Sequence, residues 1–124
     1  MEGKVMMVDD DPDILTTVRT IFESEGLDIL TVGSGKECVN ELKRGFKGVI
    51  LMDIMMPRMD GWDTIQTIVD EGLIEGNIIS MLTAKDAPDQ IMEELAENVV
   101  DYITKPFDAD ELISTVRGYL SFLD

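Results

Sequence analysis

The chain reads Val49-Ile50-Leu51-Met52-Asp53 near its middle, four apolar residues followed by a carboxylate. Consecutive apolar residues, rather than an alternating pattern, are typical of a strand that is buried on both faces of a parallel sheet. A carboxylate at the mouth of a buried strand costs free energy unless another group pairs with it. Asp53 therefore needs compensating groups from other parts of the chain.

Two other segments offer such groups at similar positions. Asp9 and Asp10 end the apolar run Val5–Val8, and Lys105 follows the run Val99–Ile103. If these strand ends meet Asp53, they form a pocket with three carboxylates and one ammonium group. Carboxylate oxygens are ligands that Mg²⁺ prefers, and a metal ion with a lysine is a common setting for phosphoryl transfer. The pattern therefore predicts a magnesium and phosphoryl site.

Apolar runs alternate with helical patterns along the chain. The predicted strands are Val5–Val8, Ile29–Val32, Val49–Met52, Ile78–Leu82 and Val99–Ile103. Helices are predicted to begin at Asp11 and Ser34, and to span Trp62–Glu71, Asp86–Glu97 and Asp108–Leu123. Asp11 before Pro12, and Ser34 three residues before Glu37, are typical helix starts. Strand–helix units with short connections predict a doubly wound α/β sheet.

The length and composition indicate one globular domain, residues 1–124. The chain is 44% apolar and 29% charged, and it is long enough for one hydrophobic core. Its apolar runs are much shorter than the roughly 20 residues of a membrane helix, and the segment after Met1 lacks the features of a secretory signal. The single Cys38 cannot form an internal disulfide, as is usual in a reducing compartment. We therefore expect a cytoplasmic protein without membrane contact.

The net charge of −16 indicates which kind of molecule the protein binds. Nucleic-acid phosphates repel such a surface, so we expect no direct nucleic-acid binding. We expect the partners to be proteins.

An ordered set of motifs resembles that of two-component response-regulator receiver domains. The motifs are Asp9-Asp10, Asp53 with Met56-Pro57-x-Met59-Asp60-Gly61, Thr83-Ala84, and Tyr102-x-x-Lys105-Pro106-Phe107. The resemblance extends from Lys4 to about Leu123. It implies a flavodoxin-like fold, a five-stranded parallel sheet in the order 2-1-3-4-5 with five helices. We interpret Asp60-Gly61 as a turn.

The resemblance also implies the reaction and the metal ligands. Asp53 would accept a phosphoryl group from a histidine kinase in a Mg²⁺-dependent reaction. Asp10 and Asp53 would bind Mg²⁺ directly, and Asp9 would bind it directly or through water. The backbone carbonyl of Met55 would be a further ligand, for which any side chain serves.

The remaining motif residues are implied to act on the phosphoryl group and to relay its presence. Lys105, aimed into the pocket by a cis peptide bond to Pro106, would balance the phosphoryl charge, and Thr83 would offer a hydroxyl. Thr83 and Tyr102 would link the pocket to a protein-interaction face formed by the last two predicted helices and the strand between them. Alternatively, Tyr102 is a half-buried packing residue with its hydroxyl at the surface.

Two positions, Met55 and Lys85, are implied to tune dephosphorylation. We predict that the bulky, apolar Met55 hinders the attacking water. The phosphoryl group should then last longer than it would beside a polar residue.

Three functions remain open from the sequence. The first is a phosphoacceptor signalling domain that catalyses its own phosphorylation and dephosphorylation. Because the chain has no His, its donor would be another protein, a sensor histidine kinase or a phosphotransfer protein, and its target an output protein or a fused output domain. The second is a phosphohydrolase with an aspartyl-phosphate intermediate, which Met55 disfavours because such enzymes usually have a second acid there. The third is a scaffold that binds partners constitutively.

Overall fold

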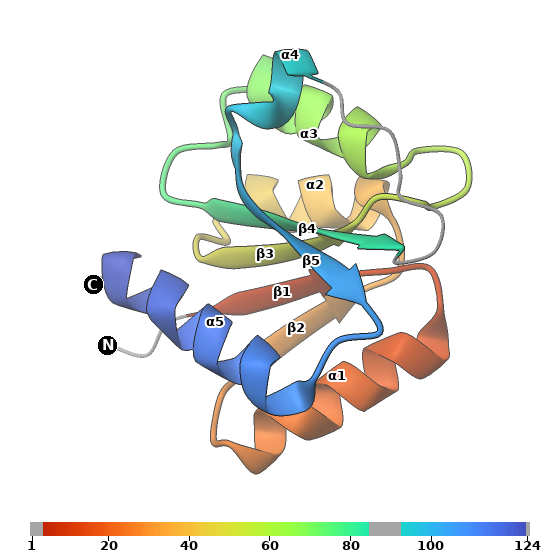
Figure 1. Ribbon diagram of the computed structural model, residues 1–124. Helices are drawn as coiled ribbons and strands as arrows, with labels where there is room; N and C mark the ends of the chain where they lie inside the picture. The colour runs from red at the N-terminus through yellow and green to blue at the C-terminus, as the bar shows by residue number, and fades with distance from the viewer. Residues whose placement is uncertain (1–3, 85–92, 124) are drawn as a thin grey trace.

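The computed structural model of the protein describes residues 4–84 and 93–123, in which strands alternate with helices (Figure 1). The strands are β1 (Val5–Val8), β2 (Ile29–Val32), β3 (Val49–Asp53), β4 (Ile78–Ala84) and β5 (Val99–Lys105). The helices are α1 (Pro12–Ser24), α2 (Gly35–Lys43), α3 (Gly61–Asp70), α4 (Glu93–Ala96) and α5 (Ala109–Leu123). Of the helix predicted over Asp86–Glu97, residues 86–92 lie outside the described residues. None of the helices in the described residues is long and apolar enough to cross a bilayer.

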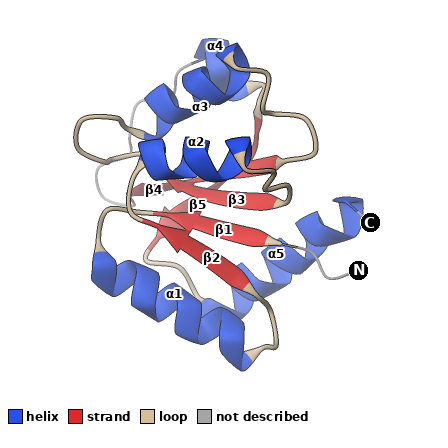
Figure 2. Cartoon of the chain, turned by 180° about the vertical axis from the view of Figure 1, so that it is seen from behind, coloured by secondary structure: helices blue, strands red, loops and turns tan. Residues whose placement is uncertain are grey.

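The strands form one parallel sheet in the order β2-β1-β3-β4-β5, which confirms the predicted topology. Helices α2, α3 and α4 cover one face, and α1 and α5 cover the other (Figures 1 and 2). Each face has its own core. Ile50 belongs to the core beneath α2 and α3, whereas Leu51 belongs to the core beneath α1 and α5. Alternate residues of β3 are thus buried on opposite faces, as its continuous apolar run predicted.

Capping residues start the first two helices. Asp11 caps α1 by accepting a hydrogen bond from the Asp13 N–H, and Pro12 is the first helical residue. Ser34 caps α2 by accepting from the Glu37 N–H at 3.1 Å. The Glu37 carboxylate accepts from the Gly33 N–H at 2.6 Å, so it closes the loop that leaves β2.

The interpretation of Asp60-Gly61 as a turn is wrong. Asp60 is the N-cap of α3, and Gly61 is its first residue. Asp60 and Asp63 each accept a hydrogen bond from the other's N–H, at 2.8 and 3.1 Å, and form a capping box. Glycine is needed because a Cβ at Gly61 would lie 2.6 Å from the carbonyl oxygen of Asp53. The motif therefore starts a helix that lies close to the end of β3.

Three strands are longer at their carboxyl ends than predicted. Strand β3 includes Asp53, β4 continues through Thr83 to Ala84, and β5 continues to Lys105. In the sheet register Asp53 pairs with Leu82, and Ala84 pairs with Lys105. The polar residues that end these runs are therefore strand residues, and their positions follow from the sheet.

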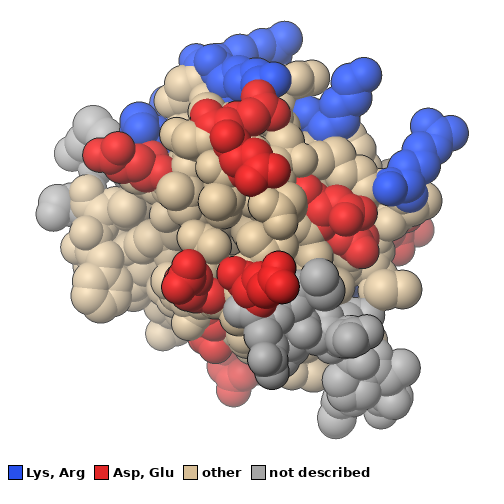
Figure 3. Space-filling model, turned by 90° about the horizontal axis from the view of Figure 1, so that it is seen from above, with Lys and Arg blue, Asp and Glu red and all other residues tan. Residues whose placement is uncertain are grey.

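Basic side chains gather toward one edge of the face seen in Figure 3, and acidic side chains are spread over the rest. The basic residues at the end of α2 and in the loop after it have acceptors nearby. Lys43 forms an ion pair with Glu71 at 2.9 Å, Arg44 forms one with Glu41 at 3.0 Å, and Lys47 donates to the Glu75 carbonyl at 3.0 Å. The two ion pairs offset the positive charge of Lys43 and Arg44.

We expect Gly35→Ala to lower the free energy of unfolding by about 1–3 kcal/mol, because the added Cβ would overlap the Thr64 hydroxyl. Thr64 is fully buried in α3 and cannot turn into solvent. Gly118→Ala in α5 is the matched control. Nothing lies within 4 Å of its added Cβ, so the helix propensity of alanine should stabilise the protein by about 1 kcal/mol. Urea unfolding followed by Trp62 fluorescence measures both variants, and effects of the same sign would contradict the close approach of α2 and α3.

Candidate functional site

Three carboxylates meet at the carboxyl ends of β1 and β3. One oxygen each from Asp9, Asp10 and Asp53 lies within 4.8 Å of the other two. Asp9 and Asp53 are only 1% and 5% exposed, whereas Asp10 is exposed. The parallel pairing of β1 with β3 brings their ends to one edge of the sheet. The predicted convergence of these three acids is present.

The chain around the acids holds the two buried carboxylates. The backbone N–H of Asp9 donates to the Val32 carbonyl at 3.2 Å, which ties the end of β1 to β2. Asp9 Oδ1 accepts from the Asp11 N–H at 2.9 Å, and Asp53 Oδ1 accepts from the Met55 N–H at 3.3 Å. Asp11 thus has two functions, as the cap of α1 and as a donor to Asp9. The sequence pattern indicated only the first.

Lys105 reaches the same pocket from the end of β5. Its Nζ lies 3.2 Å from Asp9 Oδ2 and 3.3 Å from Asp53 Oδ1. The bond to Pro106 is cis, as the resemblance implied. One ammonium group therefore contacts both buried carboxylates.

The ionisation of the pocket follows from burial and from these contacts. Burial, and then the neighbouring Asp9 carboxylate, raise the pKa of Asp53 from an ordinary value of 3.8 to about 6, although Lys105 and the Met55 N–H oppose the rise. Burial alone would lower the pKa of Lys105, but Asp53 and Asp9 outweigh burial and raise it. Lys105 is therefore charged at neutral pH, and among the described residues it is the one cation paired with Asp9 and Asp53.

These residues fit a magnesium ion. Mg²⁺ takes about six oxygens at about 2.0–2.1 Å and keeps several waters, so two or three carboxylates suffice. Asp9, Asp10 and Asp53 could hold it, and the excess of negative charge favours a divalent cation. The ligand role of the Met55 carbonyl stays a prediction.

Thr83 and Tyr102 lie on the neighbouring strands β4 and β5. Thr83 is half-buried near the end of β4, and its partner in the sheet register is Thr104 of β5. The Tyr102 ring packs against Trp62 of α3, with ring centroids 6.4 Å apart. The Tyr102 hydroxyl is buried and has no hydrogen-bond partner within the part of the chain that the structure describes. It does not reach the surface, so the alternative of a surface hydroxyl is wrong.

Sequence reasoning missed the contribution of Trp62. The sequence pattern indicated only that Trp62 starts a helix. In the structure its side chain is 5% exposed and packs against Tyr102. No spacing pattern links two residues that lie on α3 and β5. Lys85, the second position implied to tune dephosphorylation, lies outside the described residues.

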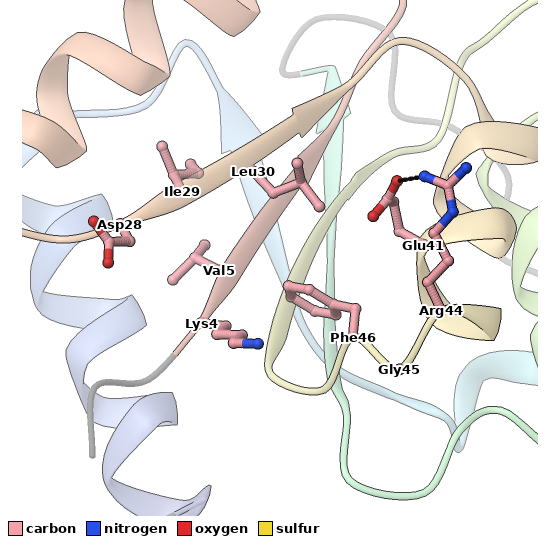
Figure 4. Close-up of a pocket in the computed structure, with 9 residues that line it drawn as sticks. All are labelled: Lys4, Val5, Asp28, Ile29, Leu30, Glu41, Arg44, Gly45 and Phe46. Atoms are coloured by element: carbon pink, nitrogen blue, oxygen red, sulfur yellow. Dashed lines mark hydrogen bonds and ion pairs between the residues drawn. The ribbon is translucent and has the colours of Figure 1, made fainter.

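A separate hollow lies at the opposite end of the sheet (Figure 4). It measures about 410 Å³ and opens between the start of β2 and the end of α2. Leu30 and Phe46 line it, and the Glu41–Arg44 ion pair stands at one side. Because it lies at the amino ends of β1 and β2, it has no part in the acid cluster.

Comparison with known proteins decides the family. The profile of the response regulator receiver domain matches residues 5–117. This chain is a member of that family. The crystal structure of a CheY-like receiver domain protein from Methanospirillum hungatei is similar, with 51% identity, a TM-score of 0.92, and coverage of 99% of this chain and 98% of that one.

Curated relatives of this receiver domain include whole regulators. Protein PilG of Pseudomonas aeruginosa is 29% identical over 120 residues, which are 94% of this chain and 87% of PilG. The heme response regulator HssR of Staphylococcus aureus is 34% identical over 115 residues, which are 93% of this chain and 50% of HssR. The chain thus spans about half the length of relatives such as HssR.

We expect Asp53→Asn to stabilise the metal-free receiver domain at pH 7 by about 1–3 kcal/mol, since one pKa unit corresponds to about 1.4 kcal/mol. The folded state holds a proton on Asp53 up to about pH 6, whereas the unfolded chain loses it near 3.8. The ionised carboxylate therefore costs stability progressively as the pH rises from about 4 to about 6.

Urea unfolding in EDTA at pH 4 and pH 7 measures this effect. Asp53→Asn should raise the free energy of unfolding at pH 7 and change it little at pH 4. Asp28→Asn, at an exposed acid far from the cluster, is the control and should change little at either pH. A loss of stability in Asp53→Asn at pH 7 would contradict the raised pKa of Asp53.

Proposed function

We propose that this receiver domain accepts a phosphoryl group on Asp53 in a Mg²⁺-dependent reaction and thereby switches a protein-interaction surface. The observation that supports the proposal best is the contact of Lys105 Nζ with both Asp9 and Asp53 beside the exposed Asp10. Two buried acids leave negative charge that one lysine does not balance. A divalent cation and a phosphoryl group bring complementary chemistry to such a pocket.

The transfer step uses an Asp53 oxygen as the nucleophile. The oxygen forms a new bond to phosphorus, while the bond from phosphorus to the donor breaks and its electron pair leaves with the donor. The donor is a phosphohistidine of a sensor kinase or phosphotransfer protein, and a small acyl phosphate can replace it. The pKa of about 6 leaves Asp53 mostly ionised, and so nucleophilic, at neutral pH.

The other pocket residues position and neutralise the transferred group. Lys105 keeps its charge and moves from pairing with Asp53 to pairing with a phosphoryl oxygen. Thr83 offers its hydroxyl to another oxygen from the adjacent strand. Bound Mg²⁺ would supply charge neutralisation at the phosphoryl oxygens. The domain would thus catalyse its own phosphorylation and, with water as the nucleophile, its own dephosphorylation.

The switch would operate through Thr83 and Tyr102. A ligand changes a distant surface only by favouring one of two conformations. Tyr102 is suited to such a change because its buried hydroxyl has no partner among the described residues, so a conformation that supplies one would be favoured. The output surface would lie around β5 and α5, where Val100 and Phe122 are 57% and 83% exposed.

The partners follow from charge and from the donor chemistry. The domain contains no His, so the phosphohistidine belongs to another protein. The net charge of −16, together with the paired basic residues after α2, supports protein partners rather than nucleic acid. The target is an output protein or a fused output domain, and the setting is the cytoplasm.

We expect acetyl phosphate with Mg²⁺ to add one phosphoryl group per chain, because Asp53 is ionised and Lys105 is charged at neutral pH. Intact-mass spectrometry measures the adduct. Asp53→Asn and addition of EDTA should each abolish it, and the control Asp28→Asn should retain it. Turnover of acetyl phosphate without an adduct would instead indicate a phosphohydrolase, and inertness would indicate a scaffold.

We expect Met55→Asn to shorten the lifetime of the phosphoryl group by roughly threefold or more, about 0.7 kcal/mol of activation free energy. Met55 follows Asp53 by two residues and is 66% exposed, so its side chain can cover the approach of water without supporting the fold. A phosphate-release time course measures the lifetime. Met55→Leu keeps the bulk and should keep the slow release, and equal rates in all three proteins would refute the role of Met55.

A further inference from the structure

Ser80 is a polar residue within the apolar centre of β4. It is 0% exposed and lies between Ile79 and Met81, which are equally buried. Its hydroxyl donates to the Asp101 carbonyl at 3.3 Å and lies 3.4 Å from the Tyr119 hydroxyl. A buried hydroxyl needs such partners. Ser80 therefore depends on residues of both β5 and α5.

The Asp101 carboxylate joins α5 to the main chain of Tyr102. The Tyr119 hydroxyl donates to Asp101 Oδ2 at 3.0 Å, and the Tyr102 N–H donates to Asp101 Oδ1 at 2.8 Å. Burial raises the pKa of Tyr119, the Ser80 hydrogen bond opposes this rise, and the Asp101 carboxylate adds to it, so the hydroxyl keeps the proton that it donates. Ser80, Asp101 and Tyr119 form one cluster, here named the Ser80 cluster.

An irregularity in the sheet coincides with this cluster. Ile79 pairs with Val99, and Ser80 pairs with Asp101, so Val100 is an additional residue on β5. A bulge of this kind redirects the side chains next to it. Asp101 then contacts α5, whereas Tyr102 packs against Trp62 on the α3 side. The two adjacent residues thus connect opposite faces of the sheet.

We propose that Asp101, held by Tyr119 and Ser80, is a positioning residue that couples Tyr102 to α5. This proposal rests on the proposed function, in which the switch operates through Tyr102, and it adds that the Tyr102 main chain moves on phosphorylation of Asp53. When the Tyr102 main chain moves, the Asp101 carboxylate moves with it. The Tyr119 hydroxyl must then follow its acceptor or lose it, and α5 shifts with Tyr119. The Ser80 cluster is the contiguous contact path that such coupling needs.

The test compares the response of α5 in wild-type protein and in Tyr119→Phe, which removes only the hydroxyl. Beryllofluoride with Mg²⁺ serves as the phosphoryl mimic, and ¹H–¹⁵N spectra of the full chain report each site. In the wild type, the amides of Val116 and Leu120 in α5 should shift on addition of the mimic. In Tyr119→Phe their shifts should fall to roughly half or less. The Met55 amide beside Asp53 should respond in both proteins and shows that the pocket is loaded.

Ser121→Ala is the matched control, because it removes an α5 hydroxyl whose hydrogen bond, among the described residues, is to the Gly118 carbonyl of the same helix. It should leave the α5 response unchanged. If Tyr119→Phe does not fold, Asp101→Ala tests the same link from an exposed position and should give the same loss. A full α5 response in Tyr119→Phe or Asp101→Ala, or no α5 response in a loaded wild type, overturns the coupling. Failure of the wild-type pocket to load contradicts the proposed function itself, and the Met55 amide separates these two results.

Discussion

Asp9 and Asp53 are two carboxylates almost excluded from water at the ends of adjacent parallel strands, and one lysine contacts both of them. Two negative charges and one positive charge leave the buried part of the pocket unbalanced, and the exposed Asp10 adds to the excess. Burial disfavours the charged form of Asp53, and nearby Asp9 adds repulsion, so the metal-free site is held at a cost in free energy. The continuous apolar strands and the cores on both faces of the sheet supply the stability that offsets this cost.

Much of this arrangement could be predicted from the sequence because the signals are local. Apolar runs without alternation marked the buried strands, and the acids or the lysine that follow three of the five runs placed the site. The predicted strands β4 and β5 ended too early. Thr83 and Thr104 are polar and were not recognised as strand residues, although they pair in the sheet. The strand order came from the resemblance, since periodicity contains no information about which strands are neighbours. Asp60-Gly61 was misread because an acid before glycine is typical of a turn, and the nearby end of β3 that requires glycine is a contact across the fold.

The contacts that sequence reasoning could not predict join residues far apart along the chain. Ser80 and Tyr119 are 39 residues apart, and Trp62 and Tyr102 belong to elements on different layers. Each pair depends on the register of β4 with β5, and the additional residue Val100 changes that register by one position. A shift of one residue reverses the face of every side chain that follows. A serine in an apolar strand was the only local sign, and by itself it does not name its partners.

The acid pocket and the Ser80 cluster differ in how completely their charges and hydrogen bonds are satisfied. This difference suggests that they have different roles. The acid pocket has excess negative charge, so a cation or a phosphoryl group changes its free energy strongly. The Ser80 cluster is paired internally, with its hydroxyls and carboxylate bonded to one another and to the Tyr102 main chain. A group whose partners are all satisfied has little affinity for a ligand but resists being separated from them. An unsatisfied pocket is therefore suited to detect a phosphoryl group, and a satisfied cluster is suited to transmit the resulting motion to α5. Tyr102 lies between the two, with its main chain bonded to the cluster and its hydroxyl without a partner in the described residues.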